Sequence, residues 1–174
     1  GRMLRLPSRD RNSRELLLVY GHHSSIERMI GLAEYLNKYC AVTMPDLPGF
    51  GGMQPFYKIG QKPTLDALAD YLAAFVKLRY RGRRFSVAGL SFGFVVITRM
   101  LQKYPEIAKK VDLTISIAGF AHRDDFAYKK SRLLLFKFGA FLLSNRLAAA
   151  FIKYAVLRPL FIQTTYRSMA NRNP

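Results

Sequence analysis

The residues of this chain best suited to chemistry are Gly89-Leu90-Ser91-Phe92-Gly93, which fit the pattern Gly-x-Ser-x-Gly. An apolar run over 85–88 predicts a buried strand before them, and an apolar stretch over 92–103, stopped by Pro105, predicts a helix after them. A strand that turns tightly into a helix holds the serine in strained geometry, with its hydroxyl above the sheet. We interpret the segment as a nucleophile elbow; the plain alternative is a glycine-flanked turn with an incidental serine.

A nucleophilic serine also needs hydrogen-bond donors for the oxyanion. The backbone N–H group of Phe92 directly follows Ser91, at the predicted start of the helix. A second donor is expected from the loop after the apolar run 15–20, where Gly21 permits a turn that directs the His22 N–H group inward. We therefore predict that Phe92 and His22 act through their main chains.

The base that would activate Ser91 is harder to assign, because the chain has three histidines. His22 and His23 both lie in the predicted oxyanion loop. His122 follows the predicted strand 111–118 and would form a triad with Asp124 or Asp125, provided that it reaches the serine hydroxyl. The alternative, which we favour, is that this segment is a polar loop.

Apolar runs and helical periodicities alternate along the chain and define the elements that position these residues. The predicted strands cover residues 3–6, 15–20, 41–44, 85–88 and 111–118. One predicted helix runs from a capping box at Ser24 and Glu27 to about Tyr39, a second is capped by Thr64, and a third covers 92–103. The order predicts an α/β fold with a mostly parallel sheet covered by helices on both faces. The loops 21–25 and 45–52 would then meet the elbow at the carboxyl edge of the sheet.

Composition narrows the classes of function. A chain of 174 residues, half of them hydrophobic, suits one domain. The single cysteine, Cys40, and a polar N-terminus without a signal sequence favour a cytoplasmic location. The adjacent His22 and His23 point apart, and the glycines over 48–52 lack the context of a nucleotide-binding loop, so we expect no metal and no cofactor.

The net charge of +17 is distributed unevenly, because no acidic residue follows Asp125. Two apolar helices that carry basic residues are predicted over 128–143 and 147–157, and neither is an uncharged run long enough for a membrane span. The asymmetry fits a solvated basic surface, which we favour, or contact with anionic lipid or nucleic acid. We expect no specific nucleic-acid partner and only weak contact with an anionic membrane surface.

Three motifs, in this order, resemble those of the α/β-hydrolase superfamily. They are Val19-Tyr20-Gly21-His22, Pro45-Asp46-Leu47-Pro48-Gly49-Phe50-Gly51 and the elbow pentapeptide around Ser91. Tyr20 departs from the pattern, since many members carry histidine there. The resemblance covers residues 3–120 well and the remainder loosely. It implies the N-terminal part of a hydrolase core over 1–120, the beginning of a helical cap over 121–174, and later strands that are missing.

In this superfamily the catalytic acid and histidine follow later strands than those predicted here. We therefore expect a fragment that ends in the cap, with its acid and histidine after Pro174, and that is inactive alone. The resemblance implies a serine hydrolase that acts on a carboxylic ester or related small acyl substrate. It argues against epoxide hydrolase and haloalkane dehalogenase chemistry, for which members use an aspartate at the elbow. The alternative is a truncated or degenerate, non-catalytic hydrolase whose basic cap binds anionic lipid, nucleic acid or a partner protein.

Overall fold

The computed structural model describes residues 1–8, 13–119, 134, 137–141 and 144–145. The chain divides into two compact units, Gly1–Phe126 and Ala127–Pro174. The strands of the first unit are β1 (Met3–Leu6), β2 (Glu15–Val19), β3 (Ala41–Pro45), β4 (Phe85–Leu90) and β5 (Val111–Ile117). Its helices are α1 (Ile26–Asn37), η1 (Phe56–Ile59, a 3-10 helix), α2 (Leu65–Tyr80), α3 (Phe92–Lys103) and α4 (Pro105–Ala108).

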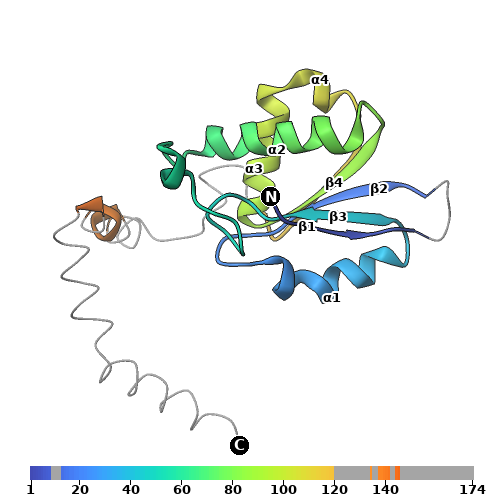
Figure 1. Ribbon diagram of the computed structural model, residues 1–174, viewed down its shortest axis with the longest axis horizontal. Coiled ribbons are helices and arrows are strands. Elements are labelled where there is room, and N and C mark those ends of the chain that lie inside the picture. Colours follow the sequence, from blue (N-terminus) through green and yellow to red (C-terminus); the bar gives the residue numbers. More distant parts are fainter. Residues whose placement is uncertain (9–12, 120–133, 135–136, 142–143, 146–174) are drawn as a thin grey trace, which may run out of the picture. The chain divides into compact units, whose positions relative to one another are not determined.

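The five strands form one sheet in the order β1-β3-β2-β4-β5 (Figure 1). β1 runs antiparallel to β3, and the other three pairings are parallel. Helix α1 covers one face of this sheet, and α2 and α3 cover the other. The structure therefore confirms the predicted fold class, a mostly parallel sheet with helices on both faces.

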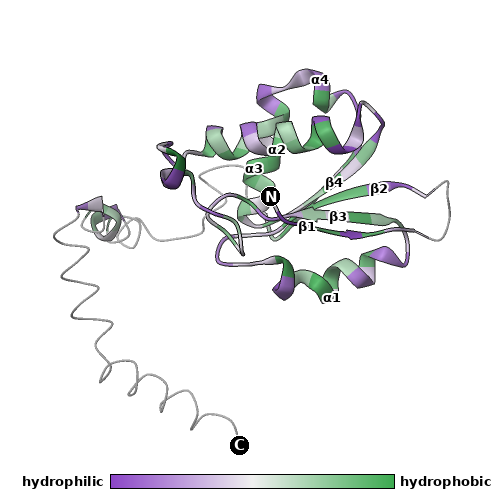
Figure 2. Ribbon diagram, in the orientation of Figure 1, coloured by the Kyte–Doolittle hydropathy of each residue, from purple (hydrophilic) through white to green (hydrophobic). Residues whose placement is uncertain are grey.

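The alternation of side chains along β2 creates two cores. On one face Leu16, Leu18 and Tyr20 pack with residues of α1, and on the other Leu17 and Val19 pack with residues of α2 and α3. All five are buried, which explains why β2 is a continuous apolar run. In Figure 2 hydrophobic residues are concentrated on the strands, and the helices carry a mixture of hydrophobic and hydrophilic residues.

The start of α2 follows the prediction, whereas the start of α1 does not. The Thr64 hydroxyl accepts a hydrogen bond from the Ala67 N–H group at 3.1 Å. In α1 the N-cap residue is Ser25, without a side-chain capping bond, so the predicted capping box at Ser24 is wrong. Glu27, the second residue of the predicted capping box, pairs through its carboxylate with Arg2, which lies just before β1.

Two short helices escaped prediction, because a four-residue segment is too short to show a helical periodicity. Helix α4 begins at Pro105, which serves as its first residue. The 3-10 helix η1 lies in the segment predicted as loop and ends at Gly60, a left-handed residue with φ of +72°.

The second unit is described only at residues 134, 137–141, 144 and 145. Residues 134, 137–141 and 144 are helical, in and directly after the predicted helix 128–143. The predicted helix 147–157 and the predicted domain boundary after residue 120 lie outside the described residues. Within the described part of the chain, no helix has the length and hydrophobicity needed to cross a membrane.

Candidate active site

Ser91 occupies the turn between β4 and α3 in a strained conformation. Its φ of 49° and ψ of −117° belong to a region that residues with a Cβ atom rarely adopt. Its N–H group donates to the Ile117 carbonyl at 2.9 Å, and its own carbonyl accepts from the Phe94 N–H group at 3.0 Å. The backbone is therefore held on both sides of the side chain, which is the geometry that the sequence predicts for an elbow.

The glycines on either side of Ser91 allow the close approach of strand and helix. A Cβ atom at Gly93 would lie 2.2 Å from the Val19 carbonyl oxygen. One at Gly89 would lie 2.4 Å from the Phe94 Cα atom. Both distances are far inside van der Waals contact with backbone atoms, so neither position accommodates a side chain.

The loop between β2 and α1 lies directly against the elbow. A Cβ atom at Gly21 would lie 3.1 Å from the Leu90 carbonyl oxygen and 3.2 Å from the Ser91 Cβ atom. Gly21 is therefore favoured because there is little space for a side chain, and not for the turn expected from the sequence. The residue of this loop with a left-handed backbone is His23, with φ of 56°. The His23 carbonyl accepts a hydrogen bond of 3.0 Å from the Arg28 side chain, which fixes that conformation.

An aromatic cluster joins the three loops that the sequence assigns to this edge of the sheet. The His22 ring makes edge contacts with the rings of Phe50 and Phe92, at centroid distances of 5.5 and 5.9 Å. Phe50 and Phe92 stack at 6.0 Å. The predicted convergence is therefore confirmed for the loop of His22, the loop of Phe50 and the elbow. A cleft of about 440 Å³ opens here, lined by His22, His23, Ser24, Ser25, Arg28, Gly49, Phe50 and Gly51.

A buried polar network holds the Pro45–Gly52 loop, and sequence reasoning missed it. The Tyr20 hydroxyl donates to the Asp46 carboxylate at 2.7 Å, and both residues are fully buried. Asp46 also accepts from the Gly52 N–H group at 3.1 Å and lies 3.3 Å from the Arg2 guanidinium. Burial and the bond to Asp46 raise the pKa of Tyr20 above its ordinary value, so the hydroxyl remains a donor.

This network gives Tyr20 a specific role at the position where it departs from the superfamily pattern. A second loop residue, Leu47, donates its N–H group to the Tyr20 hydroxyl at 3.3 Å. Gly51, with φ of 56°, is required because a Cβ atom there would lie 2.4 Å from the Asp46 carboxylate. One feature of the sequence could have revealed this network. Asp46 follows a predicted buried strand, and a buried carboxylate needs hydrogen-bond or ion-pair partners.

The described residues include Ser91 and the β2–α1 loop, and they leave the predicted base unassigned. Phe92 is the first residue of α3, so its N–H group has no partner within the helix, as an oxyanion donor requires. His22 and His23 are the histidines of the described part, and both lie in the β2–α1 loop. His122, Asp124 and Asp125 lie outside the described residues, so their triad stays a prediction. No group of three or more potential metal ligands occurs among the residues that the structure describes.

No protein-family model matches the sequence, and no curated protein matches it. Solved structures do. A Pseudomonas aeruginosa protein described provisionally as an epoxide hydrolase is 25% identical, with a TM-score of 0.67 over 97% of this chain. A thermophilic esterase from Thermogutta terrifontis is 25% identical, with a TM-score of 0.58 over 70% of this chain. An α/β hydrolase from a Medee basin deep-sea metagenome is 16% identical, with a TM-score of 0.55 over 66% of this chain.

This chain has the α/β-hydrolase fold. It spans 54%, 41% and 39% of those three structures, in the same order. The α/β-hydrolase fold places the loops after β2, β3 and β4 at one edge of the sheet, and the aromatic cluster shows them in contact there. The resemblance seen in the three sequence motifs is thus confirmed at the level of the fold.

Proposed function

We propose that the chain carries the nucleophile and oxyanion-binding part of a serine hydrolase that acts on a carboxylic ester or a related small acyl substrate. The observation that carries this proposal is the strained backbone of Ser91, held between β4 and α3 by hydrogen bonds on both sides. Strain of this kind costs roughly 1–3 kcal/mol and persists where the surrounding structure imposes it. An incidental turn serine gives no reason to maintain that cost.

In the proposed reaction the Ser91 hydroxyl oxygen attacks the carbonyl carbon of the ester while a base removes its proton. The carbonyl oxygen becomes an oxyanion that accepts hydrogen bonds from the N–H groups of Phe92 and His22. The intermediate collapses to an acyl-serine and expels the alcohol, which takes up the proton. Water then attacks the acyl carbon and releases the carboxylic acid. The close approach of Gly21 to the elbow, where an added Cβ atom would lie 3.2 Å from the Ser91 Cβ atom, supports the role of His22, the next residue of the same loop.

The identity of the nucleophile favours acyl transfer over epoxide opening, although one structural neighbour is described provisionally as an epoxide hydrolase. An aspartate that opens an epoxide forms an ester, which water can hydrolyse. A serine in the same role would form an ether, which water does not cleave under these conditions. Ser91 therefore fits a substrate with a carbonyl group, such as an ester.

Labelling with a fluorophosphonate probe tests the proposal. The probe phosphonylates an activated serine, and in a protein that includes the catalytic histidine and acid we expect labelling of Ser91 that is lost in Ser91→Ala. Ser24→Ala is the matched control, because Ser24 lines the neighbouring cleft and should not affect labelling. Mass spectrometry of the labelled peptide and circular dichroism of each variant complete the experiment. Labelling that persists in Ser91→Ala, or no labelling of a folded protein that includes the histidine and acid, would contradict the proposal.

A further inference from the structure

The amino edge of the sheet, at the opposite end of the strands from Ser91, carries four arginines and one glutamate that pairs with three of them. Arg5 lies in β1, Arg79 in the last turn of α2, and Arg81 and Arg83 in the turn between α2 and β4. Glu15 is the first residue of β2. The four arginines line a pocket of about 560 Å³, called here the arginine pocket.

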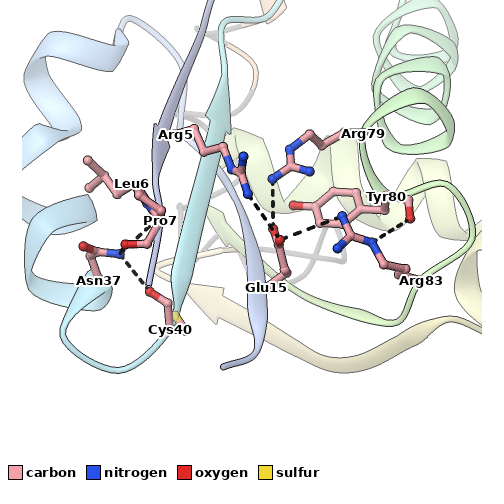
Figure 3. Close-up of polar contacts among 9 residues, drawn as sticks. All are labelled: Arg5, Leu6, Pro7, Glu15, Asn37, Cys40, Arg79, Tyr80 and Arg83. Atoms are coloured by element: carbon pink, nitrogen blue, oxygen red, sulfur yellow. Dashed lines mark hydrogen bonds and ion pairs between the residues drawn. The ribbon is translucent and has the colours of Figure 1, made fainter. Parts of the chain in front are cut away.

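One carboxylate serves three of these guanidinium groups (Figure 3). Glu15 accepts a hydrogen bond from Arg79 at 3.2 Å. The nearest nitrogens of Arg5 and Arg83 lie 3.8 and 3.9 Å from the same carboxylate, beyond hydrogen-bond distance. Four arginines and one glutamate leave a net charge of +3, and Arg5 and Arg83 keep donors available to a further anion.

The backbone around the pocket is held in place before any ligand arrives. The Arg83 Nε atom and its backbone N–H group both donate to the Tyr80 carbonyl, at 3.4 and 2.9 Å. Tyr80 is buried and stacks on Phe85 at a centroid distance of 4.2 Å. Because the turn is ordered in advance, an anion bound there would meet a low entropic cost.

A purely structural role explains only part of this arrangement. The bond between Arg79 and Glu15 is sufficient to tie the end of α2 to the start of β2. Arg5 and Arg83, whose side chains are 49% and 61% exposed, add like charges beside it. Glu15 offsets part of their mutual repulsion, and a second anion would offset more of it. Planar guanidinium groups match the oxygens of a phosphate, which they bind in pairs of parallel hydrogen bonds.

We propose that the arginine pocket binds a phosphate group. Arg5 and Arg83 donate to the phosphate oxygens directly, and Glu15 and Arg79 hold them in position. The phosphate belongs either to a small polar molecule or to an amphiphile. The second source is relevant because an apolar groove, lined in part by Tyr71, Ala74 and Phe75, shares Met3, Leu78 and Arg79 with the pocket.

The test is isothermal titration calorimetry of the 174-residue chain with inorganic phosphate and with octyl phosphate at low salt. We expect saturable binding at one site. The double variant Arg5→Gln/Arg83→Gln should weaken it at least tenfold, and Arg83→Lys, which keeps the charge but loses the planar fork, should weaken it less. Arg99→Gln is the matched control, because Arg99 pairs with Asp66 away from the pocket. Circular dichroism verifies that each variant is folded.

The two ligands distinguish the sources. A tenfold preference for octyl phosphate that Leu78→Ser removes would assign the phosphate to an amphiphile, and equal affinities would assign it to a small polar molecule. Leu78 is 79% exposed, so this substitution leaves the fold intact. The proposal is wrong if neither ligand shows saturable binding. It is also wrong if binding survives the double variant, which would assign it to basic residues elsewhere in the chain.

Discussion

The two ends of the sheet are organised differently, although the same strands reach both. At the carboxyl end the determining features are conformational, namely the positive φ of Ser91 and the lack of space for a Cβ atom at Gly93. At the amino end they are electrostatic, with Glu15 shared among arginines that stay partly exposed. Substitutions should therefore act through packing at the carboxyl end, independently of salt, and through charge at the amino end, where salt weakens them.

Gly93→Ala should lower the free energy of unfolding more than any of the other substitutions below. It tests directly whether packing determines the carboxyl end of the sheet. The new Cβ atom would lie 2.2 Å from a backbone oxygen that cannot move without disturbing β2. We expect a loss of about 3 kcal/mol in the free energy of unfolding, at the upper end of overpacking costs. Urea unfolding measures it, at low and high salt.

Gly31→Ala is the matched control for this substitution. Gly31 lies in the middle of α1, and nothing lies within 4 Å of a Cβ atom placed there. This change should stabilise the protein by about 1 kcal/mol, because alanine is the better helix former. Equal effects of the two substitutions would refute the packing argument.

Tyr20→Phe should have the next largest effect. It leaves the buried Asp46 carboxylate without its 2.7 Å donor, at a cost of about 2 kcal/mol near neutral pH. Tyr57→Phe, at a tyrosine that is 69% exposed, should change nothing. A loss in Tyr57→Phe as large as that in Tyr20→Phe would rule out the buried network as the cause.

The same variant has a signature in the pH dependence. The pKa of Tyr20 is raised from an ordinary value of 10.0 by burial and by Asp46. Its contribution to stability is thus fully present below pH 10 and is lost as the pH rises above it. Between pH 8 and 11 the difference in stability between the wild type and Tyr20→Phe should therefore shrink. A constant difference would show that Tyr20 does not titrate with unfolding.

Ser91→Gly and Ser91→Ala both remove the hydroxyl group, so a comparison of their stabilities measures the backbone strain at position 91 alone. Glycine adopts a φ of 49° without steric cost, so Ser91→Gly should be more stable than Ser91→Ala by about 1 kcal/mol. Both variants should lack fluorophosphonate labelling. Thermal unfolding of the two proteins makes the comparison. If Ser91→Ala were the more stable variant, the conformation of Ser91 would carry no strain.

Glu15→Gln should cause the smallest loss of folding stability, and this loss should depend most strongly on the salt concentration. It removes the shared partner of the arginines and should cost about 0.5 kcal/mol in low salt. The loss should fall in 0.5 M sodium chloride, because the remaining repulsion is screened. The exposed Glu34 supplies the control Glu34→Gln, which should have no effect. A loss that is unchanged by salt would mean that Glu15 acts through packing.

Much of the fold could be predicted from the sequence, because the signals involved are local. The apolar runs of β2 and β4, the cap at Thr64 and the stop before Pro105 each depend on a few neighbouring residues. The elbow was predictable for the same reason, since strand, glycine, serine and helix are contiguous. The short helix α4 was missed because four residues do not establish a period.

The sequence by itself therefore determined the order of the elements, the fold class and the position of Ser91 in a turn with no room for side chains on either side. Only the tertiary structure decided which distant groups meet. Tyr20 and Asp46 are 26 positions apart, and Glu15 and Arg79 are 64 apart. The partner of Glu27 shows why local reading fails at such points: a capping box was available, yet the approach of β1 brought Arg2 to the same carboxylate. A charged side chain takes whichever partner the folded chain presents, and sequence distance does not reveal that choice.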